Sequence, residues 1–287
     1  MSDAFGARLH AAVIERGPLC VGIDPHASLL SAWGLPDDAS GLERFTMTVV
    51  DALAEQVAVL KPQSAFFERH GSAGIQVLER AAAAAREAGA LVLLDAKRGD
   101  IGSTATAYAD AFLRPSSPLS VDAVTVSPFL GPDSLRPFFD AAHQYGRGVF
   151  VLALTSNPDG AQVQLARTSA PAGGPAAGDA GATTVAGAVL ASVAAENLGA
   201  QPMGSVGAVV GATIGSTTED LDVNGPLLAP GFGAQGGTVA DLHRVFGPSV
   251  RRVVPTTSRD VLAAGPDVAA LQAAAQACAL TVAGLWA

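Results

Sequence analysis

Lysine is nearly absent from this sequence, although basic residues are not. Fifteen of the 17 basic residues are arginine, and Lys61 and Lys97 are the only lysines in the chain. Arginine makes the better structural ion pair because its guanidinium is planar, bidentate and always charged, whereas a lysine ammonium can release its proton. A GC-rich coding bias would explain the arginines but not the two exceptions. We therefore expect the lysines at positions where arginine cannot do the chemistry, such as proton delivery or Schiff-base formation.

Other scarcities narrow the class of protein. The formal net charge of −9 argues against a general nucleic-acid binder, although a few arginines could still bind a small anion. Cys20 and Cys278 lie in no CxxC pair and have no histidine at zinc spacing, which argues against a disulfide framework and a zinc site. The first residues lack the apolar run of a signal peptide, and no uninterrupted apolar run approaches about 18 residues. We therefore expect a cytoplasmic protein without membrane contact.

What the sequence does contain is a repeated alternation of short apolar, β-branched runs with Ala-rich stretches. The runs are 19–25, 57–63, 90–97, 122–128, 148–155, 206–213, 226–233 and 251–258. Their near-continuous apolarity is typical of parallel strands covered on both faces, and stretches such as 72–88 and 104–114 suit the covering helices. Eight strand–helix units predict an α/β fold, a (β/α)8 TIM barrel forming a single domain over 1–287. A doubly wound open sheet is the alternative, but no GxGxxG follows the first run.

One segment interrupts the alternation. Residues 157–182 are rich in Gly, Pro and Ala and show no clear period, so we expect a long loop after the fifth strand. Loops of this length are either functional lids or disordered insertions.

Active sites of such barrels lie where the strands end and the loops to the next helices begin. A polar residue at a strand end needs a reason, because the surrounding core is apolar. The candidates at the predicted strand ends are Asp24, Lys61, Asp95, Lys97, Ser127, Thr155, Ser156, Thr213, Gln235 and Arg259.

The stretch "DAKRGD" concentrates charge at the end of the third predicted strand. Asp95 and Lys97 share a face because strand side chains alternate, and Asp100 follows closely enough for its carboxylate to return toward Lys97. Lys61 ends the neighbouring strand, so we predict a charged cluster of Lys61, Asp95, Lys97 and Asp100. A plain ion-pair network holding the barrel rim is the alternative. Flanking carboxylates favour the ammonium form, which suits a general acid better than a Schiff-base nucleophile.

A second candidate site lies after the seventh predicted strand. "PGFGAQGG", residues 230–237, offers backbone amides ahead of a helix, and Arg259 ends the eighth strand beside it. Phosphate binding by these two loops is common in TIM barrels. We predict a phosphate site there, with Gln235 and Gly236 as loop contacts and Arg259 as the cation.

These motifs together resemble the orotidine 5′-phosphate decarboxylase family, and in particular its bacterial group that carries the DAKRGD form. The family pattern Asp-x-Lys-x-x-Asp-x-x-x-Thr, the lysine of the preceding strand, the aspartate of the first strand and the serine of the fifth strand all have counterparts between about residues 5 and 270. These counterparts are Asp95, Lys97, Asp100 and Thr104, then Lys61 in "LKPQSAFFERHG", Asp24 in "GIDP" and Ser156 in "LTSN".

The resemblance implies decarboxylation of orotidine 5′-monophosphate to uridine 5′-monophosphate without cofactor or metal. Lys97 would stabilise and protonate the C6 carbanion, Asp95 would lie beside the substrate carboxylate, and Lys61 would complete the network. Asp24 would bind the ribose and Ser156 would meet the pyrimidine, while Ser127 is a weaker candidate for ligand contact.

The resemblance also implies a homodimer with shared active sites. Asp100 and Thr104 would reach into the site of the neighbouring subunit.

Two alternative functions remain open at this point. One is a Mg²⁺-dependent sugar-phosphate decarboxylase or synthase of similar fold; such enzymes place an acidic metal ligand where this chain has Lys61, and Mg²⁺ prefers oxygen ligands. The other is a nucleotide-binding barrel without catalytic activity, which would need no proton donor.

Overall fold

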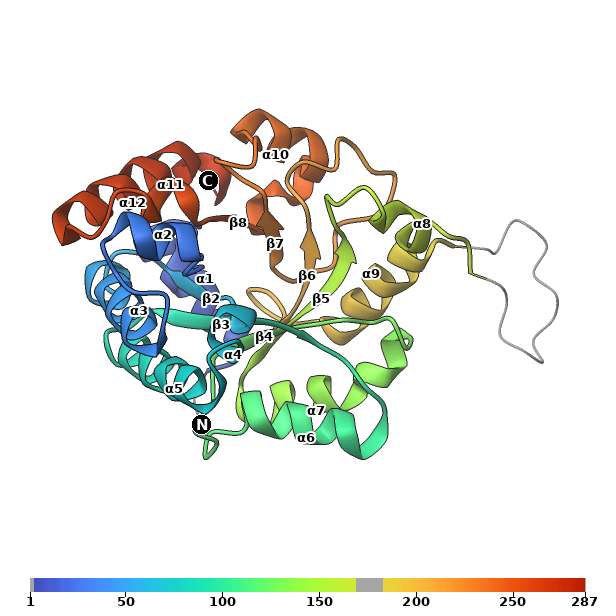
Figure 1. Cartoon of the computed structure of the whole chain (residues 1–287). Helices are drawn as coiled ribbons and strands as arrows, with labels where there is room; N and C mark the ends of the chain where they lie inside the picture. Colours follow the sequence, from blue (N-terminus) through green and yellow to red (C-terminus); the bar gives the residue numbers. More distant parts are fainter. Residues whose placement is uncertain (1–2, 169–182, 287) are drawn as a thin grey trace, which may run out of the picture.

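Eight parallel strands pair in chain order and close into a barrel (Figure 1). The computed structural model describes residues 3–168 and 183–286. The strands are β1 Cys20–Ile23, β2 Val59–Pro62, β3 Leu91–Arg98, β4 Ala123–Val126, β5 Gly148–Leu154, β6 Val206–Val210, β7 Leu227–Pro230 and β8 Val253–Thr257. Each matches a predicted apolar run to within three residues at its ends. The predicted TIM barrel is therefore confirmed, and the open doubly wound sheet is wrong.

Helices surround the barrel and cover its outer face (Figure 1). The longer ones are α1 Phe5–Arg16, α3 Ala39–Leu53, α5 Gly71–Glu87, α6 Gly102–Leu113, α7 Arg136–Tyr145, α9 Val185–Glu196, α10 Val239–Phe246 and α12 Val268–Val282. The shorter ones are α2 Ala27–Ala32, α4 Ser64–Glu68, α8 Gly160–Gln164, α11 Arg259–Leu262 and the 3-10 turns η1 Pro132–Leu135, η3 Gly247–Arg252 and η4 Ala283–Trp286. The expected helices 72–88 and 104–114 correspond to α5 and α6.

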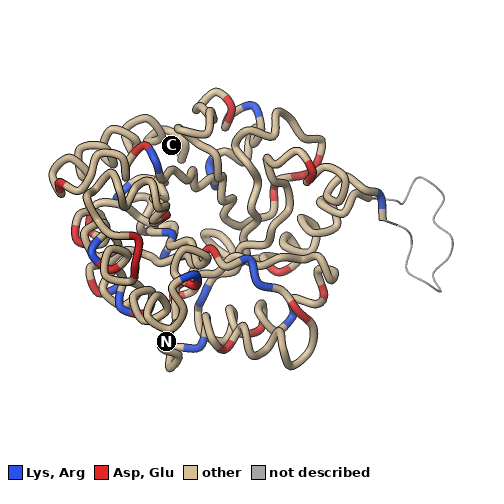
Figure 2. Tube along the Cα trace, in the orientation of Figure 1, with Lys and Arg blue, Asp and Glu red and all other residues tan. Residues whose placement is uncertain are grey.

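Sequence periodicity explains how these helices cover the barrel. In α5 the buried residues recur at helical spacing, at Gly74, Val77, Leu78, Ala81 and Ala85 among others. Small residues on this face let the helix lie close to β3. Figure 2 shows acidic and basic residues interspersed along the outer helices, as expected for solvated faces.

A separate apolar cluster fills the inside of the barrel and is closed by α1. Phe5 lies edge-on to Phe150 of β5, with ring centroids 6.0 Å apart. Gly148 opens β5 because a Cβ there would lie 2.4 Å from the Phe5 ring. Helix α1 therefore closes the interior of the barrel at the ends where the strands begin, and the mouth of the barrel lies where they finish.

The predicted loop 157–182 is only partly within the described residues. Over that part the segment contains one short helix, α8, and Gln164 at its end is bound to Thr155 just after β5. The Gln164 side chain accepts a hydrogen bond from the Thr155 amide at 2.9 Å and donates one to the Thr155 hydroxyl at 2.7 Å. Residues 169–182 lie outside the described residues, so the choice between lid and insertion stays untested.

The C-terminal helical stretch Val268–Trp286 is 19 residues long and, by length and composition alone, could cross a membrane. Its Leu271, Ala275 and Val282 are buried against the rest of the protein. The Trp286 indole donates a hydrogen bond to the Val253 carbonyl at 2.6 Å, which fastens the end of this stretch to β8. These contacts are those of a helix packed on a barrel.

Candidate active site

The ends of β2 and β3 bring two lysines to one carboxylate. Lys61 Nζ lies 3.2 Å from Asp95 Oδ2, and Lys97 Nζ lies 2.6 Å from Asp95 Oδ1. Lys61 and Asp95 are buried, whereas the Lys97 side chain is 45% exposed. Lys61 is therefore held in place by its surroundings, and Lys97 presents the more accessible ammonium.

Thr125 of β4 links the backbone amide of Lys97 to the carboxylate of Asp95. Its buried hydroxyl donates a hydrogen bond to Asp95 Oδ1 at 2.8 Å and accepts one from the Lys97 amide at 3.0 Å. Lys97 has a φ of 48°, and the pairing of β3 with β4 shifts between Leu94 and Arg98. Left-handed backbone at a residue other than glycine costs about 1–3 kcal/mol and clusters at functional sites. The strand is thus bent at the residue that presents the ammonium.

The charged groups of the cluster stabilise one another in their ionised forms. Burial alone would raise the pKa of Asp95, but the ammoniums of Lys61 and Lys97 and the hydrogen bonds from Lys97 and Thr125 outweigh it and lower that pKa to about 2. Burial alone would lower the pKa of Lys61, but the carboxylates of Asp95 and Asp24 outweigh it and raise that pKa. Asp95 is therefore a carboxylate and Lys61 an ammonium at neutral pH.

A cavity of about 520 Å³ opens at the same end of the barrel. Its lining includes four of the predicted site residues, Asp24, Lys61, Gln235 and Arg259. Sequence reasoning did not assign the other polar lining residues to the site; they are His26, Ser28, Gln63, Thr256, Thr257 and Ser258. Their positions next to strand ends are the only signal in the sequence that could have pointed to them. For the serines and threonines this signal is weak, because these residues are also common in turns.

Asp24 has an unused acceptor at this cavity. Ser258 donates a hydrogen bond to Asp24 Oδ2 at 2.5 Å. Asp24 Oδ1 is buried and has no hydrogen-bond partner among the described residues. A buried carboxylate oxygen without a partner is costly, so this atom is suited to accept a hydrogen bond from a ligand hydroxyl.

The glycine-rich loop after β7 is ordered by bonds within the protein. The Gly237 amide donates to the Gly231 carbonyl at 3.0 Å, and the Ala234 amide donates to Asp260 Oδ2 at 2.7 Å. The expected set of free amides is therefore partly occupied, because loop carbonyls and a neighbouring carboxylate satisfy them. Gln235 and Arg259 still line the cavity with side-chain donors.

The structure does not bring every candidate residue to the cluster. Asp100 accepts a hydrogen bond from the Ile101 amide at 2.8 Å, and the described residues include no ion pair between Asp100 and Lys97. The expectation that this carboxylate returns to Lys97 of the same chain is wrong for the single chain, since β3 ends at Arg98 and Asp100 instead leads into α6. Asp95 and Lys97 are in the cluster but are not among the residues lining the cavity. The remaining candidates do not line it either; they are Thr104, Ser127, Thr155, Ser156, Thr213 and Gly236.

These features define a class of protein, a TIM-barrel enzyme with a cluster of two ammoniums and a carboxylate at its strand ends and a polar cavity beside it. Within the described residues, no group of three or more His, Cys, Asp or Glu side chains is arranged to hold a metal ion. The arrangement can present a proton from Lys97 to a ligand while Lys61 and Asp95 remain charged beside it.

Comparison with known proteins identifies the family. The profile of the orotidine 5′-phosphate decarboxylase / HUMPS family matches residues 17–274, and the chain belongs to this family. The chain is 65% identical over 274 residues to an orotidine 5′-phosphate decarboxylase of Salinispora arenicola, covering 95% of each chain. It is 60% identical over 281 residues to the Streptomyces coelicolor enzyme of that name, covering 98% of this chain and 97% of the other.

Solved structures agree with the fold. A crystal structure from Streptomyces avermitilis superposes with a TM-score of 0.92 at 60% identity, covering 99% of this chain and 96% of the other. The OMP decarboxylase of Leishmania donovani superposes with a TM-score of 0.74 at 29% identity, covering 99% of both chains.

Proposed function

We propose that this protein decarboxylates orotidine 5′-monophosphate to uridine 5′-monophosphate. The relatives that are 60–65% identical over nearly the whole chain carry this activity in their names. The observation that carries the proposal is the Lys61–Asp95–Lys97 cluster, with its exposed ammonium at the ends of β2 and β3. We also propose membership of the bacterial group with the DAKRGD form, since residues 95–100 read DAKRGD.

The proposed reaction needs a group that accepts charge at C6 of the pyrimidine. The C6–carboxylate bond breaks, carbon dioxide leaves and the electron pair stays on C6. Lys97 stabilises this pair and transfers a proton from Nζ to C6; the neutral amine then regains a proton from solvent. General acid catalysis of this kind accelerates reactions by about 10²–10⁴.

Asp95 has a second role in the proposal. With its pKa lowered to about 2 it is a carboxylate in the working range, and it would lie beside the substrate carboxylate. Repulsion between the two would favour loss of carbon dioxide. Lys61 keeps Asp95 charged and in place at 3.2 Å.

The rest of the nucleotide has matching groups at the cavity. Asp24 Oδ1 would accept a ribose hydroxyl, and Gln235 and Arg259 would hold the phosphate. Binding energy from the phosphate would help to assemble the site, as remote parts of substrates do in many enzymes. Ser127, Ser156 and Gly236 remain proposed contacts for the pyrimidine and the phosphate.

We propose a homodimer in which Asp100 and Thr104 complete the neighbouring site. Asp100 makes no ion pair with the lysines of its own chain among the described residues, and Thr104 is exposed on α6. Large apolar side chains are exposed nearby, with Ile101 62% and Phe129 78% exposed. A second copy of the chain would cover them.

Co-expression of two inactive variants tests the shared site. Lys97→Ala and Asp100→Ala chains would form mixed dimers in which one site has both native residues, so about a quarter of all sites should be active after random pairing. Complete inactivity of the mixture, with dimers present by sedimentation, would contradict sharing.

A Mg²⁺-dependent sugar-phosphate enzyme of the same family is less compatible with this site. Lys61 occupies the position where an acidic metal ligand is expected in those enzymes, and an ammonium repels a divalent cation. A cytoplasmic location is proposed from the sequence alone.

Loss of orotidylate absorbance on mixing with purified protein in excess chelator tests the function directly. We expect full turnover under these conditions. Turnover that disappears in chelator and returns with Mg²⁺ would favour the metal-dependent alternative, and binding without turnover would favour a nucleotide-binding barrel.

A further inference from the structure

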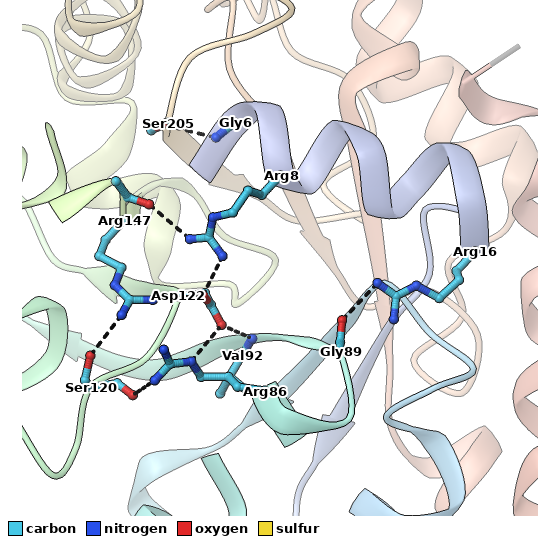
Figure 3. Close-up of polar contacts among 11 residues, drawn as sticks. Gly6, Arg8, Arg16, Arg86, Gly89, Val92, Ser120, Asp122, Arg147 and Ser205 are labelled. Atoms are coloured by element: carbon cyan, nitrogen blue, oxygen red, sulfur yellow. Dashed lines mark hydrogen bonds and ion pairs between the residues drawn. The ribbon is translucent and has the colours of Figure 1, made fainter. Parts of the chain in front are cut away.

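The end of the barrel opposite the candidate active site holds a second charged cluster (Figure 3). Asp122 lies just before β4 and is almost fully buried. Three arginines from different elements surround it: Arg8 of α1, Arg86 of α5 and Arg147 just before β5. We name this group the basal arginine cluster.

The single carboxylate is saturated by its neighbours. Asp122 Oδ1 accepts hydrogen bonds from Arg8 at 2.7 Å and from Arg147 at 2.9 Å. Asp122 Oδ2 accepts the Val92 amide at 3.0 Å and forms an ion pair with Arg86 at 3.6 Å. The basal arginine cluster thus carries three positive charges against one negative charge.

Part of this excess positive charge is buried. The Arg147 side chain is only 8% exposed, and its Nε has no hydrogen-bond partner among the described residues. Burial, the largest cause, lowers the pKa of Arg147, and the neighbouring Arg86 and Arg8 lower it further against the opposing effect of Asp122. Because three cations share one carboxylate, the buried positive charge is only partly compensated, which favours an anion from outside the chain.

A cavity of about 410 Å³ lies at the cluster, lined by its four charged residues together with Gly89, Ala90, Leu91, Pro115 and Tyr145. We propose that this cavity binds a compact, multiply charged oxyanion of the phosphate class. Guanidinium groups bind such oxyanions through paired charge-assisted hydrogen bonds. Arg86 is the most accessible of the three arginines, with 35% of its side chain exposed, and would make the first contact.

A purely structural network would need fewer cations. Elsewhere on α5, Arg80 pairs with one carboxylate, Glu43, at 2.7 Å. Arg252 likewise pairs with Asp222 at 2.9 Å. At the basal cavity Asp122 is the only acidic residue of the lining, so the charge there is not balanced in the same way.

Calorimetric titration of the full-length protein with pyrophosphate tests the proposal. Saturating uridine 5′-monophosphate is present to occupy the candidate active site, and chloride at matched ionic strength is the blank. We expect one pyrophosphate per chain. Arg86→Gln should weaken its binding by about tenfold or more, whereas Arg80→Gln on the same helix should leave it unchanged. Inorganic phosphate in a parallel titration should bind at the same site more weakly, because it carries fewer charges.

Two outcomes would overturn the proposal. One is that pyrophosphate gives no heat beyond the chloride blank, and the other is that Arg86→Gln and Arg80→Gln weaken pyrophosphate binding equally. Circular dichroism checks that Arg86→Gln folds. If it does not, Arg86→Lys replaces it, because it keeps the charge but loses the planar fork; unchanged pyrophosphate affinity in that variant would refute the site.

Discussion

Replacement of Lys97 by arginine separates charge from proton transfer. The Lys97 side chain is 45% exposed and contacts Asp95 at 2.6 Å, so a guanidinium can form a similar ion pair there. A partly exposed pair of this kind contributes about 0–1 kcal/mol, which predicts a small change in the free energy of unfolding. Both side chains are unbranched at Cβ, so the left-handed backbone at position 97 costs both about the same.

The effect on turnover should be far larger than the effect on stability. A guanidinium does not release its proton in a protein, so the general acid is lost while the positive charge remains. General acid catalysis contributes about 10²–10⁴ in rate, equivalent to roughly 3–5 kcal/mol of activation free energy. We expect kcat of Lys97→Arg to fall by at least that factor, and by more if the longer side chain displaces the pyrimidine. KM should change much less.

Loss of orotidylate absorbance under saturating substrate measures kcat, and thermal unfolding measures stability in the same preparation. Arg98→Lys is the matched control, because it alters the adjacent side chain without removing a proton donor. We expect this variant to keep most of its turnover. Near-normal turnover in Lys97→Arg would refute proton donation by Lys97 and leave the cluster as an ion-pair network at the rim.

Three further variants probe the same structure. The lowered pKa of Asp95, from 3.8 to about 2, contributes about 2 kcal/mol of stability that is present above pH 4 and lost as the pH falls toward 2; the difference in denaturant midpoint between wild type and Asp95→Asn should therefore shrink below pH 4. Thr125→Val removes one hydrogen bond to Asp95 and one from the Lys97 amide, so we expect about 1–3 kcal/mol lower stability and a reduced kcat at similar KM, with Thr125→Ser restoring both. Asp122→Ala leaves the basal arginines without their carboxylate, so chemical unfolding should show a loss of about 3–5 kcal/mol, while kcat of the protein that remains folded stays unchanged.

The sequence predicted the barrel well because its signal is physical and local. Parallel strands covered on both faces are apolar along their whole length, and eight such runs are separated by helical stretches. The positions of Asp24 and Lys61 followed from the same reasoning, since a charged residue at the end of an apolar run lies at the barrel mouth. These predictions needed no knowledge of distant contacts.

The predictions that failed or were incomplete depended on backbone geometry beyond the end of the strand. Alternation along β3 places Asp95 and Lys97 together, but it does not specify a φ of 48° at Lys97 or the hydrogen bond from its amide to Thr125. The return of Asp100 assumed a tight turn, whereas the chain leads from Arg98 toward α6. The amides of the glycine-rich loop are partly occupied because Asp260, far along the chain, accepts one of them.

The charge of the active-site cluster links these observations to assembly. Within one chain, the ammoniums of Lys61 and Lys97 share one contacting carboxylate, Asp95, and Asp24 adds a negative charge that acts on Lys61. Among the described residues, Lys97 therefore has no carboxylate partner that it does not share. Charged groups that are buried or partly buried are stabilised by pairing, and the next acidic residue along the sequence, Asp100, accepts a hydrogen bond from the Ile101 amide and makes no ion pair with Lys97 among the described residues. A substrate carboxylate alone could be that further partner, but it leaves during the reaction as carbon dioxide. A permanent acidic group from a second copy would give Lys97 a second carboxylate beside Asp95 before and after that step, which links the proposed dimer to the proposed proton donor.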